Sequence, residues 1–394
     1  MKKLIAVILI VCLLFGGVLA YLQTKKSPTT EPETEPTVVQ SDELAPAESK
    51  APDFEAMSKL YSPDETVVTI DGTDISWREF YYWYYYYAKR ISDEMDMMSL
   101  YYGQESSWED TAGAENLTYA DLPATYAENQ LKQIETIQGF ARKNNVELND
   151  EDMAKYEETL KADMESVCGE GATLEDFEKV LDSMYMDMNV YRHMDETDLY
   201  YTRSLSEIYG ANGEKVSDEE AVKYLTDKGY MSALHILLMT EDESGEALDE
   251  DSARKLKEQA QSISDELKAI DEQDKRLMRF KELVEEFNED PGMSYYPDGY
   301  TFLAGTMVEE FEKTTQEMED YEVSDPVETT YGYHVIMKMP LGPDCLLVGD
   351  STPTPVKTMV AAEEYTNALD DYYESIEVKY KDGFVVPKIL DYIN

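Results

Sequence analysis

The spacing of apolar side chains predicts a mainly helical first half of the chain after one short strand. Alternating apolar positions give a strand over residues 66–70, and the Asp71-Gly72 pair behind it is typical of a tight turn. Helical spacing then recurs as far as about residue 208. The predicted helices cover 77–91 and 122–142, a segment that begins after Asn149, another that begins after Thr173, a long one through Tyr191 and Leu199, and a short one capped at Ser217.

Strand and helix patterns alternate after residue 230, which indicates a small α+β domain. Its last two strands form a hairpin from Val323 to Met339 that turns at Gly332. A helix over 356–373 and a strand over 376–380 follow. These last elements cannot bury themselves alone, so we expect them to pack back on the earlier helices. Before the hairpin, the pattern predicts strands over 232–239 and 300–302 and helices over 252–270, 279–287 and 308–318.

The N-terminus has the pattern of an export signal, because Lys2-Lys3 precedes an apolar run from Leu4 to Leu22. The run is longer than the ~7–15 residues of an ordinary signal core, so it is either a cleaved signal peptide or an uncleaved membrane anchor. The Thr-, Pro- and Glu-rich stretch behind it has too few large apolar side chains to fold. The predicted organisation is a signal or anchor (1–22), a disordered tether (23–61), a helical domain (62–228), an α+β domain (229–341) and a C-terminal segment that packs on the helical domain (342–394).

Acidic side chains far outnumber basic ones: 84 Asp and Glu against 34 Lys and Arg give a formal net charge of −50. This balance excludes nucleic acid as a partner, because a phosphate backbone needs cationic side chains to replace its counterions. It also disfavours binding to anionic lipid headgroups. Outside the N-terminal run, Cys168 and Cys345 either form one disulfide in an oxidising exterior or remain thiols.

Tyrosine crowds the predicted helix 77–91, where Trp83 lies among tyrosines in the run 81–87. Such a helix is usually a core and interface element. The alternative is an apolar face with polar tips that holds unfolded chain. Ser76 is expected to cap this helix, with Glu79 three residues further on completing a capping box.

Two of the three histidines lie on predicted strands of the α+β domain. His235 lies in the strand 232–239 and His334 in the second strand of the hairpin, which suggests that both belong to one site. His193 lies in a helix among polar neighbours. We therefore predict that it is a surface or packing residue without a role in a site.

Four motifs follow one another in the α+β domain. The first is Leu234-His235-Ile236-Leu237-Leu238, and the second is the helix from Phe280 to Phe287 with Asp290 behind it. Gly305 to Phe311 and Val323 to Ile336 form the third and fourth. In this order they resemble the parvulin peptidyl-prolyl isomerases, and with the flanking helices the chain is similar to exported parvulin foldases of the PrsA and SurA kind. The resemblance implies a multidomain fold, in which a mainly α-helical chaperone-like domain (the N-terminal segment plus a C-terminal helix) carries an inserted α+β parvulin domain.

The resemblance also implies a proline pocket with a polar and an apolar part. His235 and His334 are expected to be paired imidazoles whose mutual hydrogen bond sets their tautomers. Rotation about an X-Pro bond faces a barrier of ~18–20 kcal/mol from amide resonance, and a catalyst lowers it by binding the twisted amide better than either planar form. The implied catalytic group is His235, Asp290, His334 and Thr329, and the implied substrate-binding group is Met307, Phe311, Leu237 and Phe302.

One stretch departs from the parvulin pattern. Parvulins usually carry Gly-Gly-Asp-Leu-Gly before the short strand, and the corresponding residues are Tyr296-Pro297-Asp298-Gly299-Tyr300. In this interpretation Gly299 replaces a pocket leucine and changes the shape of the pocket. The loop Glu241-Asp242-Glu243 is acidic, so phosphorylated substrates are not expected.

These features predict an exported peptidyl-prolyl isomerase and foldase, either anchored at the outer face of a bacterial cytoplasmic membrane or released into the cell wall space. Its expected partners are unfolded or newly exported polypeptides with X-Pro bonds and, through the N-terminal segment, the membrane. Neither a cofactor nor a metal is expected. Two alternatives stay open: a holdase or binding protein with a catalytically weak parvulin-like domain, and a metal site built from His235, His334 and Asp290.

Overall fold

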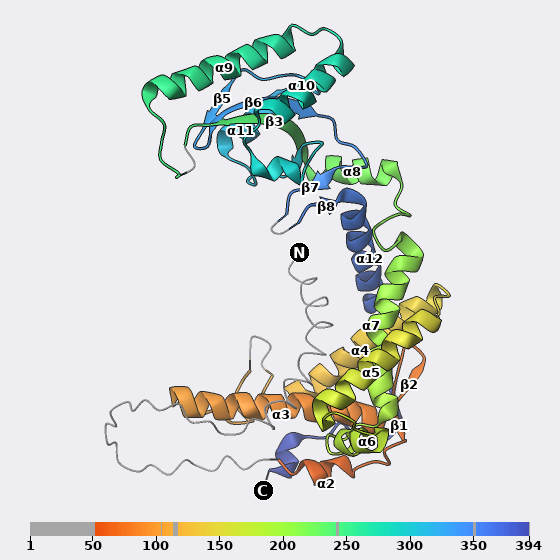
Figure 1. The fold of residues 1–394 in the computed structure, drawn as a ribbon. Helices are drawn as coiled ribbons and strands as arrows, with labels where there is room; N and C mark the ends of the chain where they lie inside the picture. Colours follow the sequence, from red (N-terminus) through yellow and green to blue (C-terminus); the bar gives the residue numbers. More distant parts are fainter. Residues whose placement is uncertain (1–51, 104, 113–116, 242–243, 350–351, 394) are drawn as a thin grey trace, which may run out of the picture. The chain divides into compact units, whose positions relative to one another are not determined.

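The described residues form two compact units, one made of residues 52–204 together with 366–393, and the other made of Leu205–Tyr365. The computed structural model (Figure 1) describes residues 52–393 apart from 104, 113–116, 242–243 and 350–351. The predicted fold class is confirmed, since both ends of the chain build a mainly helical unit and an α+β unit is inserted between them.

The N-terminal predictions lie largely outside the described residues. This applies to the signal or anchor over 1–22 and to the tether as far as residue 51. Over the part of the chain that is described, no helix is both long and apolar enough to cross a bilayer.

Within the described part of the chain, the helical unit combines seven α-helical segments with one small antiparallel sheet, in which β1 lies between β2 and β9. Residues 378–380 near the C-terminus pair with residues 68–70 near the start of the described chain. Its elements are α2 (Phe54–Ser58), β1 (Thr66–Ile70), β2 (Thr73–Ser76), α3 (Trp77–Tyr102), α4 (Leu122–Lys143), α5 (Asp150–Cys168), α6 (Leu174–Asp182), α7 (Met188–Tyr209, as far as Ser204), the end of α12 (Val356–Ser375), β9 (Val378–Tyr380) and the short 3₁₀ helix η2 (Ile389–Tyr392).

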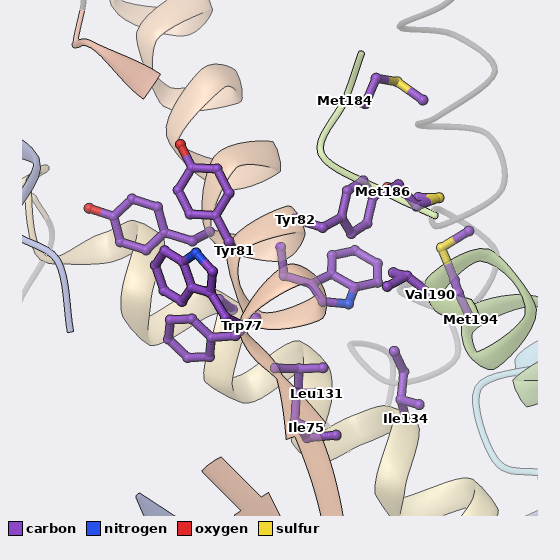
Figure 2. Close-up of a cluster of buried hydrophobic side chains, with 14 of the residues drawn as sticks. Ile75, Trp77, Tyr81, Tyr82, Leu131, Ile134, Met184, Met186, Val190 and Met194 are labelled. Carbon is purple, nitrogen blue, oxygen red and sulfur yellow. The ribbon is translucent and has the colours of Figure 1, made fainter. Parts of the chain in front are cut away.

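Helix α3 is the centre of this unit. Because side chains leave a helix in every direction over one turn of 3.6 residues, the consecutive rings of Phe80 to Tyr84 surround the axis, and each is at most 2% exposed. Figure 2 shows Trp77 and Tyr81 on one side of the helix and Tyr82 beside Met186 on another. These rings form the core, so they do not offer a face for unfolded chain.

Helix α3 also runs beyond its predicted end at residue 91, as far as Tyr102. It stops where Gly103 adopts the left-handed conformation (φ 62°), which a residue without Cβ adopts readily. The last turns of the extension expose apolar side chains instead of burying them, namely those of Met97, Leu100 and Tyr101. The prediction ended too early because the apolar spacing fades before a helix-stopping residue occurs.

The last part of the predicted tether is folded. Asp53 caps α2 by accepting the N–H of Ala56 (2.9 Å), and its own N–H donates to the carbonyl of Tyr392 (2.8 Å). Met57 is fully buried in the core of the helical unit. The prediction of disorder is therefore wrong for residues 52–61, because this segment has apolar side chains that the core accepts.

The predicted cap of α3 forms only in part. Ser76 accepts the N–H of Glu79 (3.2 Å), but the Glu79 carboxylate does not return to the cap and instead lies 2.6 Å from His193 Nδ1. Complete capping boxes form at Asn149, Thr173 and Ser217.

The inserted unit is built on a six-stranded sheet with the order β5-β6-β3-β4-β7-β8. Strands β7 and β8 lie in a loop for which no strand was predicted. Its elements are the end of α7, α8 (Asp218–Lys228), β3 (Met231–Met239), α9 (Glu250–Lys268), α10 (Gln273–Phe287), the 3₁₀ helix η1 (Pro291–Ser294), β4 (Tyr300–Phe302), α11 (Glu309–Glu317), β5 (Val327–Thr329), β6 (Gly332–Met339), β7 (Leu346–Leu347), β8 (Thr354–Pro355) and the start of α12.

Successive side chains of β3 alternate between the two faces of this sheet. Leu234, Ile236 and Leu238 share one face and pack in a cluster with apolar residues of α9 and α10. His235 and Leu237 therefore point to the opposite face, where α11 packs against the sheet. Both histidines of the unit are buried with these strands.

Candidate active site

The sheet register places His235 and His334 side by side. Strand β3 pairs antiparallel with β6, so that His235 lies opposite Ile336 and Leu237 lies opposite His334. Residues that face each other across two strands share one face of the sheet, and diagonal neighbours are within reach of ring side chains. The two imidazoles accordingly contact each other edge to face, with 5.2 Å between ring centroids.

Aromatic rings enclose the two histidines. Phe311 of α11 packs edge-on against His235 (5.2 Å between centroids) and against His334 (5.5 Å). Phe302 of β4 lies behind Phe311 at 5.9 Å. These four side chains are each at most 5% exposed, so the imidazoles lie in a nearly dry, apolar setting.

The segment after α10 carries Asp290 to the histidines. Asn288 accepts the N–H of Leu237 through its side chain (2.9 Å), and the N–H of Glu289 donates to the Leu237 carbonyl (2.9 Å). These bonds fix the segment along β3. Asp290 Oδ2 then lies 3.0 Å from His235 Nε2, which is an ion-pair distance without a regular hydrogen bond.

Two further groups hold the Asp290 carboxylate. Oδ1 accepts the N–H of Gly292 (2.8 Å) as the cap of η1, and Oδ2 accepts the hydroxyl of Tyr300 (2.9 Å). Burial alone would raise the pKa of Asp290, but the contact with His235 and these hydrogen bonds outweigh it and lower the pKa to about 2. The carboxylate is therefore charged at neutral pH.

His334 is held differently. Its Nε2 lies 2.9 Å from Thr329 Oγ1, the hydroxyl that also accepts the N–H of Tyr331 (3.1 Å) at the tip of the hairpin. Burial, with a smaller contribution from His235, lowers the pKa of His334 to about 3. The imidazole is therefore neutral at physiological pH.

The expected mutual hydrogen bond between the imidazoles does not form. Both nitrogens of His235 and Nδ1 of His334 are buried without a hydrogen-bond partner among the described residues. Instead, Asp290 Oδ2 is the polar neighbour of the His235 ring and Thr329 Oγ1 is that of the His334 ring. Each tautomer is set by its own polar neighbour rather than by the other imidazole.

The structure joins six of the eight predicted site residues by direct contacts: His235, His334, Asp290, Thr329, Phe311 and Phe302. Leu237 is 5% exposed on the same face as His235. Met307 is half-buried and packs against the cluster that contains Phe311, and its backbone N–H donates to Glu312 (2.7 Å). Among the contacts described, neither of these two side chains touches an imidazole.

Gly299 has a different role from the one the sequence suggested. It adopts a left-handed conformation (φ 104°), and a Cβ atom there would lie 2.6 Å from the backbone oxygen of Ala233. A side chain at this position would strike β3, so the residue is not a truncated pocket leucine. The next residue, Tyr300, instead packs flat on His235, with centroids 5.5 Å apart.

Sequence reasoning therefore missed Tyr300 and Asn288. Both lie beside residues that the motifs identified, but their contacts depend on a turn and a strand edge that the sequence pattern does not specify. The metal alternative is not supported, because no group of three or more His, Cys, Asp and Glu side chains within the described ranges is placed to hold an ion. Cys168 and Cys345 do not form a disulfide with each other.

Comparison with known families identifies the class of this domain. Residues 235–339 match the family described as "Rotamase: PPIC-type PPIASE domain". The inserted unit thus carries a parvulin domain of the PPIC-type rotamase family, as the motifs predicted.

The curated relatives are bacterial foldases. The chain is 27% identical over 221 residues to the foldase protein PrsA of Oceanobacillus iheyensis, an alignment that covers 55% of this chain and 61% of the relative. It is 35% identical over 130 residues to PrsA of Halalkalibacterium halodurans, which covers 32% of each chain. The chain therefore spans less than two thirds of the length of these relatives.

Solved structures of the same class resemble the chain more loosely. The crystal structure of PrsA from Bacillus subtilis is 19% identical, and the match covers 67% of this chain and 89% of that one, with a TM-score of 0.24. A TM-score this low does not establish a common arrangement of the two whole chains.

Proposed function

We propose that this protein is an extracytoplasmic peptidyl-prolyl cis/trans isomerase of the parvulin type that assists the folding of exported polypeptides. One observation carries the proposal: His235, His334, Asp290 and Phe311 converge on one face of the sheet inside a PPIC-type domain. The names of the curated relatives, all foldases, support the wider role.

The proposed reaction needs no covalent step. The barrier to rotation about an X-Pro bond, ~18–20 kcal/mol, comes from amide resonance, and it falls when the twisted amide is bound more tightly than the planar forms. The proposed apolar contacts for a proline ring are the half-buried Met307 and the neighbouring Phe311 and Leu237, with Phe302 packed behind Phe311. As resonance is lost, the carbonyl becomes more polar in a dry site where fixed dipoles act strongly.

The polar groups suit that task because they are fixed before substrate arrives. Thr329 and His334 form one hydrogen-bonded pair, and His235 Nε2 and Asp290 Oδ2 lie 3.0 Å apart as a second close pair. His334 is neutral and Asp290 is anionic, so neither is set up to exchange a proton near neutral pH. We propose these four residues as the catalytic group acting through their field.

The proposed location is the outer face of the cytoplasmic membrane or the cell wall space. It rests on Lys2-Lys3 and the apolar run over 4–22, which have the pattern of an export signal or anchor. Unfolded chains with X-Pro bonds are the proposed partners. Folding such chains outside the cytoplasm is limited by slow X-Pro exchange, which takes tens of seconds or more without catalysis.

The test is the rate of cis/trans exchange in X-Pro peptides in the presence of the full chain. Acceleration is expected, and His334→Ala and Asp290→Ala should each reduce kcat/KM by roughly 10- to 100-fold. Met278→Ala is a matched control, because Met278 is 62% exposed on α10 of the same unit. No acceleration by the unaltered chain would overturn the proposed activity.

A holdase with a weak isomerase domain is the second candidate. The last turns of α3 favour it, since Met97, Leu100 and Tyr101 are 55%, 76% and 68% exposed. Flexible Met side chains suit surfaces that accept many partners. If Met97→Ser with Leu100→Ser abolishes suppression of aggregation while X-Pro exchange is unchanged, holding is a separate activity of this helix. Unchanged suppression excludes this surface.

A further inference from the structure

The phenol of Tyr300 makes two contacts in the site at once. Its hydroxyl donates to Asp290 Oδ2 (2.9 Å), the same oxygen that lies 3.0 Å from His235 Nε2. Its ring lies nearly parallel to the His235 imidazole, with an angle of 29° between the planes and 5.5 Å between centroids. One side chain therefore touches both members of the His235–Asp290 pair.

The surrounding backbone leaves the phenol little freedom. A Cβ atom on Gly292 would lie 2.1 Å from the Tyr300 hydroxyl, so the hydroxyl occupies the space that any other residue at 292 would fill. The preceding Gly299 turns the chain against β3, and the Tyr296 ring packs against the phenol at 4.7 Å between centroids. Tyr300 itself is only 9% exposed.

The chemistry of these atoms fixes where protons lie. Burial and the neighbouring carboxylate raise the pKa of Tyr300 well above its usual value, so the phenol remains a donor. An ionised carboxylate can only accept hydrogen bonds. The carboxylate lies 3.0 Å from His235 Nε2, so of the two tautomers of a neutral ring it favours the one with the proton on Nε2 and the lone pair on Nδ1.

We propose that Tyr300 is a positioning residue, whose hydroxyl anchors Asp290 and whose ring supports His235, so that His235 is held in one orientation and one tautomer. The inference rests on the proposed isomerase function for its catalytic consequence, although the tautomer itself is a property of the free protein. Tyr300 does not act on the substrate. It acts by keeping the lone pair of His235 aimed in a single direction.

The first experiment measures the tautomer without substrate. The full chain is labelled with ¹⁵N-histidine, and its three imidazoles give separate ring-nitrogen signals. In the unaltered chain His235 should show only the Nε2–H form, and in Tyr300→Phe it should become a mixture of both forms. Tyr296→Phe is the matched control, because it removes a hydroxyl from the adjoining ring and is expected to change nothing. A single unchanged tautomer in Tyr300→Phe would overturn the proposal.

The second experiment measures catalysis. Tyr300→Phe should lower kcat for X-Pro exchange roughly tenfold with KM unchanged, because a hydrogen bond to a charged group is lost while the apolar surface remains. The acid limb of the pH profile should also move to higher pH, since Asp290 loses a donor that stabilises its charge. A change in KM with kcat unaltered, or a pH profile that does not move, would contradict a positioning role.

A third experiment perturbs the hydrogen bond between Tyr300 and Asp290 through Gly292, which lies beside the Tyr300 hydroxyl. Gly292→Ala places a methyl group where the Tyr300 hydroxyl lies and should lower kcat to the level of Tyr300→Phe. The double variant should be no slower than either single one, because both remove the same hydrogen bond. Losses that multiply would overturn the proposal. If the unaltered chain shows no exchange activity, the proposed function fails, and the tautomer measurement still decides the inference.

Discussion

Two histidines of this chain, one partly buried and one buried, differ in charge state, and their neighbours explain why. In the helical unit, His193 Nδ1 lies 2.6 Å from Glu79, and its Nε2 lies 3.0 Å from Glu135. In the parvulin domain, His334 faces the Thr329 hydroxyl and the rings of Phe311 and His235. Burial opposes the charged form in both places, so the partners decide the outcome.

The pKa values diverge accordingly. Burial would lower the pKa of His193, but the two carboxylates outweigh it and raise the pKa to about 10. Burial lowers the pKa of His334 to about 3, because only the more distant Asp290 opposes it. The first imidazole is a structural cation that joins α3, α4 and α7. The second is a neutral dipole, which suits a site that stabilises a twisted amide without proton transfer.

The strongest way to break this comparison is Glu135→Gln. The Glu135 side chain is fully buried, lies against His193 and accepts hydrogen bonds from Arg142 (2.8 Å) and Thr73 (2.7 Å). Its loss leaves a buried imidazolium with one carboxylate, so the helical unit should lose about 3 kcal/mol of unfolding free energy.

Urea unfolding followed by tryptophan fluorescence measures this loss selectively. The three tryptophans, Trp77, Trp83 and Trp108, all lie in the helical unit. Glu151→Gln is the control, since the Glu151 pair with Lys155 is exposed and contributes little. An equal loss of stability in both variants would show that the Glu135–His193 pair contributes no more than an exposed pair.

Raising the pH should weaken the helical unit next. The folded-state pKa of His193, about 10, lies above the unfolded value of 6.5, so its contribution is fully present below pH 6.5 and is lost as the pH rises toward 10. The expected loss between pH 7 and pH 10 is about 3 kcal/mol. His193→Gln should remove this slope, and an unchanged slope in that variant would refute the assignment.

Lowering the pH should weaken the parvulin domain instead. The folded-state pKa of His334, about 3, lies below the unfolded value of 6.5. Between these two pH values the imidazole is protonated in the unfolded chain and neutral in the folded domain. Between pH 6.5 and pH 4.5 the domain should lose about 2 kcal/mol relative to a His334→Gln variant. Histidine ring signals should show His334 neutral and His193 charged throughout this range.

Much of the parvulin site was predictable because its residues lie on elements with strong local patterns. The alternation around His235 and His334 specified two strands, and a strand register brings such residues to one face. Asp290 was found through a motif that follows a helix. Both the strand alternation and the motif after the helix are local in sequence, and the structure has the elements that they predict.

The rest depended on contacts between distant residues. Ser76 and Glu79 have the spacing of a capping box, yet Glu79 pairs with His193, 114 positions further along the chain. A buried ion pair outweighs a local cap, and the local pattern does not show it. Tyr300 was missed for a related reason, because the left-handed turn at Gly299 that places it becomes visible only when β3 lies beside it.

The smallest expected effect sharpens the comparison at the neutral imidazole. Thr329→Val keeps the shape of the side chain but removes the hydroxyl that lies 2.9 Å from His334 Nε2. The domain should lose about 1 kcal/mol, since a buried nitrogen loses its hydrogen-bond partner. Turnover in X-Pro exchange should fall several-fold as the imidazole gains rotational freedom. Thr329→Ser retains the hydroxyl and should restore both quantities. If Val and Ser behave alike, the hydroxyl does not hold His334, and burial alone accounts for its neutral state.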